Sequence, residues 1–270
     1  ILIGLFLATV LPFLIMIILS FKNSDIINSP KDLLPTINEL KHIFSNPKIL
    51  LKNYVEVWQA GNFKIYFLNT FLITIFVVVG NIIFDTMAAY ILSRKQFFGK
   101  KLIFFLIISR MMIPVQILII PIFILIKQLS LYDTLLALAL PNIIQGFGIF
   151  LMKQYFDGIP RALDEAAIID GASDLQILRY ILFPIAKPAL AVLIINTALS
   201  TWNAFLLPLI LTQSEAKRVL GLGLALYKSQ FNVDYVHSMA ASTLAVLPIL
   251  LLFLFFQNYI ISGLTKGAVK

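Results

Sequence analysis

Six long runs of apolar residues dominate the chain, and polar residues gather between them. Each run is about 20 residues long, the length that a helix needs to cross ~30 Å of hydrocarbon. None shows the strict alternation of a barrel strand, and only helices and closed barrels satisfy their backbone polar groups in lipid. We therefore expect an all-α membrane protein with one domain over residues 1–270 and six transmembrane helices. The expected spans are residues 1–21, 65–92, 102–126, 134–152, 188–211 and 239–261.

The composition supports a membrane protein. Hydrophobic residues make up 60% of the chain and charged residues 13%, whereas soluble domains carry about 25% charge. Cysteine is absent, which excludes disulfides and a thiol nucleophile. The net charge of +8 suits contact with anionic lipid headgroups. Because the basic residues lie in loops between the spans and not on one face, we expect no nucleic-acid partner.

The first apolar run is too long for the core of a signal peptide and lacks a small-residue cleavage site. The chain starts without methionine, so we expect a short segment to precede it. Basic residues divide evenly between the two sets of loops, but residues 93–101 hold four of them and no acid. Since charge near span ends counts most, we predict that this loop and both termini are cytoplasmic.

The loop between the fourth and fifth spans, residues 153–187, has strong helix signals. Pro160 suits the first helical position, and Asp164 and Glu165 follow near the positive end of the helix dipole. Asp170 and Gly171 form a natural stop, because glycine adopts the left-handed conformation that ends many helices. A first short helix is predicted between these signals.

A second short helix follows in the same loop. Ser173 and Gln176 have the spacing of a capping box, and Pro184 is expected to end this helix. The two helices would be hinged at Gly171. In the first helix, Ala166 and Ala167 form a low-relief face that a partner protein can approach closely. The charged residues expected around that face are Arg161, Asp164, Glu165 and Asp170.

The same loop resembles the EAA loop of ABC-importer permeases. The residues that carry the resemblance are Glu165-Ala166-Ala167, Asp170-Gly171-Ala172 and Ile181-Leu182-Phe183-Pro184. Further matches, in order from about residue 50 to the end, are similar to the carbohydrate-uptake subgroup, which includes the maltose-type permeases. They are Asn53-Tyr54, Asn69-Thr70, Ala88-Ala89-Tyr90, Met112-Ile113-Pro114, Ile149-Phe150-Leu151, Trp202-Asn203 with Pro208-Leu209, and the tail from Gly263 to Lys270.

The resemblance implies a fold and a set of partners. The fold is the type I ABC-importer permease fold with a cytoplasmic coupling helix, in a bacterial or archaeal cell membrane. The partners are a homologous permease, two cytoplasmic ATPase subunits and an extracytoplasmic sugar-binding protein, besides membrane lipid. The implied ATPase-coupling residues are Arg161, Asp164, Glu165, Ala166, Ala167, Asp170 and Gly171.

No catalytic, cofactor or metal site is expected. The chain lacks the G-x-x-x-x-G-K-[ST] loop that cradles nucleotide phosphates, so ATP hydrolysis would occur on separate subunits. An enzyme would need paired carboxylates or a histidine-rich motif at one membrane face. His42 and His237 have no second ligand at metal spacing and are expected to be solvated or to cap helices. Permeases for glycerol phosphate or polyamine, and secondary transporters, remain alternatives.

Two charges interrupt apolar spans. Asp85 lies nine residues before Arg94, and Arg110 lies nine after Lys101, so both sit about 13 Å from the same membrane face. A lone charge at such depth costs ~2.5–3.5 kcal/mol. We therefore predict an intramembrane ion pair, with a substrate or gating site and separate solvation in a water-filled cavity as alternatives.

Amide and aromatic side chains in the fourth and fifth spans suit contact with a sugar. The alternative is that they serve helix packing and interfacial anchoring. The candidates for lining a pathway are Asn142, Gln145, Asn196, Trp202 and Asn203.

Overall fold

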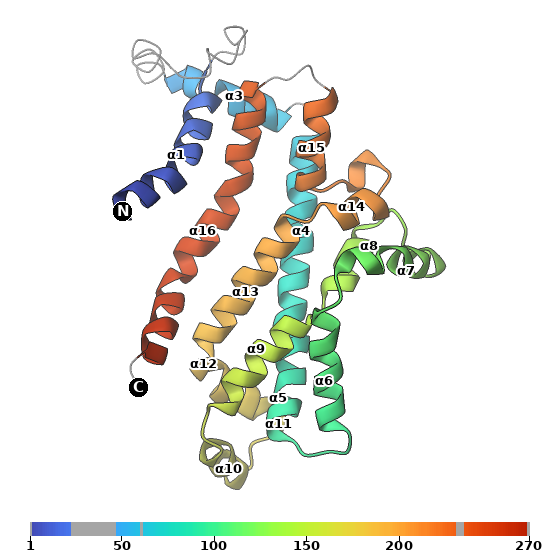
Figure 1. Ribbon diagram of the computed structural model, residues 1–270, viewed down its shortest axis with the longest axis vertical. Coiled ribbons are helices and arrows are strands. Elements are labelled where there is room, and N and C mark those ends of the chain that lie inside the picture. Colours follow the sequence, from blue (N-terminus) through green and yellow to red (C-terminus); the bar gives the residue numbers. More distant parts are fainter. Residues whose placement is uncertain (1, 23–46, 60–61, 231–234, 269–270) are drawn as a thin grey trace. The chain divides into compact units, whose positions relative to one another are not determined.

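The computed structural model describes residues 2–22, 47–59, 62–230 and 235–268, and every regular element within these ranges is a helix (Figure 1). The predicted all-α fold is therefore confirmed. His42 lies among residues 23–46, outside the described residues. The chain divides into two compact units, Ile1–Thr70 with Ala204–Leu209 and Gln213–Leu251, and Phe71–Asn203 with Ile210–Thr212 and Leu252–Lys270.

In the first unit, α3 (Pro47–Gln59) holds the end of α1 (Leu2–Ser20). Asn53 Nδ2 donates hydrogen bonds to the carbonyl oxygens of Ser20, at 2.8 Å, and Lys22, at 2.7 Å. The last carbonyls of a helix have no partner within the helix. The buried Asn53 amide supplies hydrogen bonds to two carbonyls where α1 ends.

The first turns of α4 (Phe63–Gly80) hold the start of α15 (Leu220–Gln230) in the same way. Asn69 Nδ2 donates to the carbonyl oxygens of Ala216 and Arg218, both at 2.9 Å. Thr70 Oγ1 accepts the backbone N–H of Leu220 at 2.7 Å. Two neighbouring side chains of α4 thus form hydrogen bonds with backbone groups of the loop before α15 and of the first residue of α15.

The long helix α16 (Tyr235–Ala268) begins in the first unit. Its His237 has Nε2 2.9 Å from Glu56 Oε2 of α3. The expectation that His237 is solvated or caps a helix was wrong, because the side chain is largely buried against a carboxylate.

The second unit is built on a helix that runs from α4 through the π-helical turn η3 (Asn81–Asp85) into α5 (Thr86–Arg94). A π turn inserts one extra residue into the helix and rotates the side chains that follow. α5 packs along α9 (Gly146–Asp157). The core between them and the following loop contains Ala89, Tyr90, Met152, Phe156, Ile159, Ala167, Ile177, Leu178, Leu182, Ala186, Ala189 and Leu193.

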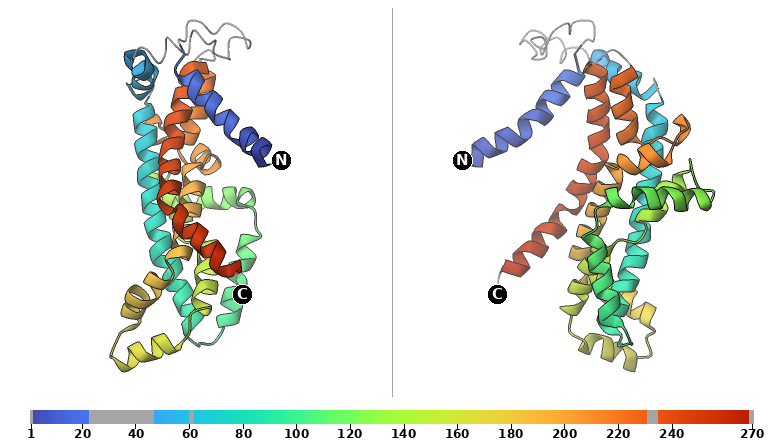
Figure 2. Two further views of the ribbon diagram at one scale, coloured as in Figure 1. Left: turned by 90° about the vertical axis from the view of Figure 1, so that its left-hand side faces the viewer. Right: turned by 45° about the vertical axis from the view of Figure 1, so that its right-hand side comes forward.

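The predicted span at residues 102–126 is not one straight helix. α6 (Lys100–Met111) and α7 (Val115–Gln128) meet at an angle of 103°, and both views in Figure 2 show α7 crossing the direction of α6. Pro114 lies at the break, where it lacks the N–H that a continuing helix would need.

The other two predicted spans of this unit are also interrupted. Residues 135–157 contain α8 (Leu135–Ala139), the short 3-10 turn η4 (Leu140–Asn142) and α9. α13 (Lys187–Trp202) stops well before residue 211, and α14 (Leu206–Leu211) follows a break.

Among the described residues, three helices are long and apolar enough to cross a membrane, or up to five if each bent pair forms one span. The shorter apolar helix at Gly4–Ser20 would be a further one. The chain is therefore a multi-pass membrane protein by length and composition, while the count of six spans stays a prediction.

Close packing in the second unit depends on Gly148. A Cβ atom at this position would lie 2.1 Å from Asp85 Oδ2 and 2.7 Å from Leu193 Cδ1. We expect Gly148→Ala to destabilise the protein by about 1–3 kcal/mol, because helices must move apart to admit the methyl group. The matched change Gly158→Ala would place its Cβ no closer than 3.4 Å to any atom outside its own neighbours. Thermal unfolding in detergent should show a lower midpoint for the first variant alone; equal midpoints would contradict this packing.

Candidate functional site

The first helix of the 153–187 loop is α10 (Ala162–Ile169). It begins two residues later than predicted, since Pro160 lies before it and accepts the N–H of Leu163 at 3.3 Å. Asp164 and Glu165 stand in the first turn, as predicted. There they oppose the partial positive charge of the free N–H groups.

The end of α10 is a Schellman motif at Gly171. Gly171 has φ of +82°, and its N–H donates to Ile168 O at 3.0 Å while that of Ala172 donates to Ala167 O at 2.9 Å. These two bonds satisfy carbonyls that the helix leaves free. The predicted glycine stop is confirmed.

The second helix begins with the predicted capping box. The backbone N–H of Ser173 donates to Gln176 Oε1 at 2.7 Å. Helical structure then continues through α11 (Asp174–Gln176), η5 (Ile177–Leu182) and α12 (Phe183–Ile185). This continuous helix ends at Ile185, one residue after Pro184, which agrees with the predicted end within one residue.

One side of α10 faces the core. Ala167 belongs to the buried cluster with Ile177 and Phe156, and Asp164 is buried as well. The prediction that Ala166 and Ala167 share an outward face was therefore wrong for Ala167. Successive residues of an α-helix are about 100° apart around its axis, so Ala166 is exposed while Ala167 faces the core.

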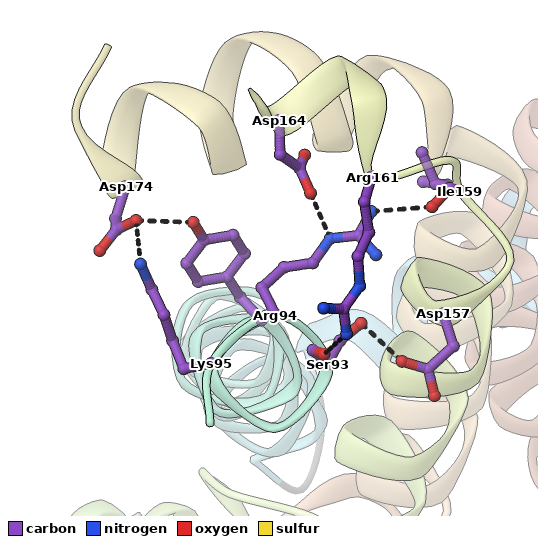
Figure 3. Close-up of polar contacts among 9 residues, drawn as sticks. Ser93, Arg94, Lys95, Asp157, Ile159, Arg161, Asp164 and Asp174 are labelled. Atoms are coloured by element: carbon purple, nitrogen blue, oxygen red, sulfur yellow. Dashed lines mark hydrogen bonds and ion pairs between the residues drawn. The ribbon is translucent and has the colours of Figure 1, made fainter. Parts of the chain in front are cut away.

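A buried ion pair joins α10 to the end of α5 (Figure 3). Arg94 Nε lies 2.5 Å from Asp164 Oδ2, and the two side chains are only 6% and 11% exposed. Arg94 Nη2 also donates to the carbonyl oxygen of Ile159 at 3.1 Å. Burial raises the pKa of the Asp164 carboxyl, and the Arg94 guanidinium opposes that rise. Separating the two charges would leave both in an apolar core.

Ser93 forms a second junction beside this pair. Its hydroxyl donates to Asp157 Oδ1 at 2.6 Å, and its carbonyl oxygen accepts from Arg161 Nη2 at 3.3 Å. Asp157 also pairs with Lys153 at 2.6 Å. The residues on either side of the Ile159–Pro160 turn are thus both tied to Ser93.

Lys95 and Tyr90 form a third junction, with the start of α11. Lys95 Nζ lies 2.6 Å from Asp174 Oδ1, and the Tyr90 hydroxyl donates to the same oxygen at 2.8 Å (Figure 3). Both short helices of the loop therefore attach to residues 90–95, at the end of α5 and just after it.

The outward side of α10 is apolar with an acidic residue. Ile169 is 85% exposed and Ile168 is 57% exposed, with Leu163 exposed nearby. Glu165, Ala166, Asp170 and Gly171 are exposed too. Beside the Schellman turn is an open hollow of about 250 Å³ lined by Asp170, Gly171, Ala172, Gln176, Tyr180 and Ile181. An apolar, partly acidic surface that the second unit leaves uncovered suits contact with another protein.

The predicted Asp85–Arg110 ion pair is not formed among the described side chains. Asp85 is fully buried, and its Oδ1 accepts the backbone N–H of Gln145 at 3.0 Å. Its Oδ2 faces Gly148 and has no hydrogen-bond partner among the described residues. Arg110 is exposed on α6. Position along a span does not say to which side of the helix a residue points.

Of the pathway candidates, Asn142 and Gln145 lie at the break before α9. Asn81 Nδ2 donates to the carbonyl oxygen of Asn142 at 2.8 Å, and Asn81 Oδ1 accepts from Thr197 at 2.8 Å. Gln145 is half-buried with its amide 3.4 Å from Asn142 O.

The remaining candidates lie at the end of α13. Asn196 and Asn203 are exposed, and Asn203 Nδ2 donates to Leu199 O at 2.9 Å. Trp202 is 5% exposed, so its side chain is buried within the chain.

Sequence reasoning missed the residues that hold the loop. In the sequence, Arg94 and Lys95 serve as evidence of orientation, and Arg94 also marks the depth of Asp85. Their position directly after an apolar span, next to Tyr90 of a matched stretch, was the available signal. Their partners lie 64 to 79 residues away, and no local pattern predicts which carboxylate each one meets.

Comparison with known proteins decides the family. Residues 86–266 match the family described as binding-protein-dependent transport system inner membrane component. The chain belongs to this family.

Relatives of this permease include sugar transport proteins. It is 36% identical over 234 residues to the arabinooligosaccharides transport system permease protein AraQ of Halalkalibacterium halodurans, covering 86% of this chain and 84% of the relative. It is 32% identical over 228 residues to the trehalose/maltose transport system permease protein MalG of Thermococcus litoralis, covering 83% and 82%.

A solved structure has the same fold. The permease aligns with a TM-score of 0.79 and 28% identity to a chain from the crystal structure of a bacterial ABC transporter involved in the import of the acidic polysaccharide alginate, covering 96% of this chain and 93% of that one. The predicted family and its ABC-importer permease fold are confirmed, and this chain is a transport component rather than an enzyme.

Proposed function

We propose that this chain is one of two homologous permease subunits of an ATP-driven oligosaccharide importer. The outward face of α10, made of Leu163, Glu165, Ala166 and Ile169, carries the proposal. It is a short, capped helix whose inner side is fixed to the core and whose outer side is apolar and uncovered. Such a face suits a groove on a partner, and in this family that partner would be a cytoplasmic ATPase.

The orientation follows from this assignment. α10 and the basic stretch at residues 93–101 would lie on the cytoplasmic side, where the ATPases and the anionic lipid surface are. With six spans, both termini would be cytoplasmic as well. An extracytoplasmic binding protein would deliver the sugar to the opposite side.

The pathway would run past the break before α9. Asn142, Gln145, Asn196 and Asn203 supply amide groups that can exchange hydrogen bonds with sugar hydroxyls. Irregular backbone at membrane depth is tolerated where it lines a cavity or is held by neighbouring groups, and Asn81 and Asp85 hold it here. Trp202 would support the wall of the pathway from inside the chain.

The substrate class can be tested with the purified complex. We expect ATP hydrolysis in reconstituted membranes, with the binding protein present, to rise several-fold with a neutral oligosaccharide. Arabino-, chito- and malto-oligosaccharides form the test set, because relatives transport such sugars by name. Glycerol phosphate and a polyamine serve as controls. Stimulation by a control solute alone would contradict sugar import, and solute uptake driven by an ion gradient without ATP would indicate a secondary transporter.

The docking face can be tested by charge reversal. We expect Glu165→Lys to leave the protein inserted and folded but to reduce sugar-stimulated ATP hydrolysis at least tenfold, because it places a cation among the contacts of α10. Gln154→Lys is the matched control, since Gln154 is exposed on α9 outside α10. Thermal unfolding and ATP hydrolysis should be measured for both. Normal stimulation in Glu165→Lys would argue against docking through this face.

A further inference from the structure

The two helices of the 160–185 loop are attached to the same end of α5. Arg94 holds α10 through Asp164, and Lys95 holds α11 through Asp174. Gly171, where we predicted a hinge, lies between these two attachments. Arg94 is the last residue of α5 and Lys95 directly follows it, so bending at Gly171 would strain or break one of the two attachments.

The two attachments differ in how strongly they resist separation. The Lys95–Asp174 pair is about half exposed at both side chains, and exposed pairs contribute little. The Arg94–Asp164 pair is almost fully removed from water, so pulling it apart would leave two uncompensated charges in the core. Arg94 also bonds Ile159 O, which fixes the chain just before α10.

We propose that Arg94 is the positioning residue that makes this loop and α5 one rigid body. A displacement of α10 is then passed straight to α5 and is not taken up at Gly171. The inference rests on the proposed function for the source of that displacement, an ATPase subunit bound to α10.

The turn that precedes α5 contacts the broken backbone before α9, which a displacement of α5 would move. α5 continues without interruption into η3, and Asp85 lies nine residues before Arg94, about 13 Å along the helix. Asp85 accepts the N–H of Gln145, and Asn81 donates to the carbonyl of Asn142. A shift of α5 therefore acts directly on the broken backbone before α9.

A crosslink tests whether the loop and α5 move together. The chain has no cysteine, so Lys95→Cys with Asp174→Cys creates a unique thiol pair, which a short bifunctional thiol reagent can join. In the full complex, we expect equal crosslinking yield in the resting state and in a vanadate-trapped state. We also expect the crosslinked complex to keep sugar-stimulated ATP hydrolysis within twofold of the untreated double variant. The two single-cysteine variants, treated with the reagent, are the controls.

Substitution of Arg94 tests its role separately. We expect Arg94→Met to lower the ratio of sugar-stimulated to basal ATP hydrolysis at least tenfold, and Arg94→Lys to lower it less. Crosslinking residues 95 and 174 as above should restore most of the ratio in Arg94→Met. Because a crosslink also stabilises the fold, the thermal unfolding midpoint of each variant is measured alongside, and a ratio that simply follows the midpoint would overturn the positioning role of Arg94. If Arg94→Met does not fold, Arg94→Lys measured with and without the crosslink decides whether Arg94 positions the loop.

The failures of the two proposals can be told apart. If the wild-type complex is stimulated by sugar but the crosslink blocks turnover, or if the yield falls on trapping, the loop moves against α5 and this inference is overturned. If the wild-type complex shows no sugar-stimulated ATP hydrolysis, the proposed function is overturned and this inference with it.

Discussion

The constraint on which this structure depends is that each backbone group freed by the end or break of a membrane helix needs a partner within the chain. Water is absent from the hydrocarbon region, so an unpaired N–H or C=O there is costly. The structure meets the constraint with a few polar side chains on neighbouring helices. Asn53 serves the end of α1, Thr70 the start of α15, and Asn81 and Asp85 the break before α9.

This constraint changes how polar residues in apolar spans are interpreted. Asp85 could be a gating charge or half of an ion pair, but its geometry is that of a cap on the backbone of another helix. Its interaction with the N–H of Gln145 is favourable because the free N–H groups at a helix start carry partial positive charge. Gly148 is required opposite it, since only a residue without a side chain leaves room for the carboxylate.

The loop at residues 160–185 is likewise held by a few side chains of a neighbouring helix. Its two short helices would be marginal alone, and the end of α5 fixes both of them through side chains of residues 90–95. Asp164 and Ala167 of α10 are buried against the core, whereas Glu165, Ala166 and Ile169 are exposed. A helix that is held on one side and uncovered on the other can transmit force from a partner without unfolding.

Local signals predicted local structure well. The glycine stop at Gly171 and the capping box at Ser173 were found from spacing alone, because the hydrogen bonds involved join residues three to five apart. Pro114 itself signals the break between α6 and α7, but the long apolar run around it favoured a single predicted span. The break before α9 has no local signal of this kind, because it depends on Asn81 and Asp85, which lie about 60 residues away. The Arg94–Asp164 pair was missed for the same reason. Spacing gives depth in the membrane but not the side of the helix, which packing decides.

The most direct test of the central claim, that α10 docks on an ATPase subunit, is the labelling rate of a thiol placed on its outward face. Ile169→Cys can be compared with Gln154→Cys, an exposed position on α9, in the isolated permease and in the complex assembled with the ATPases. The account predicts that assembly slows the reaction of Ile169→Cys with a water-soluble thiol reagent at least tenfold and leaves Gln154→Cys unchanged. Equal labelling of Ile169→Cys before and after assembly would contradict it.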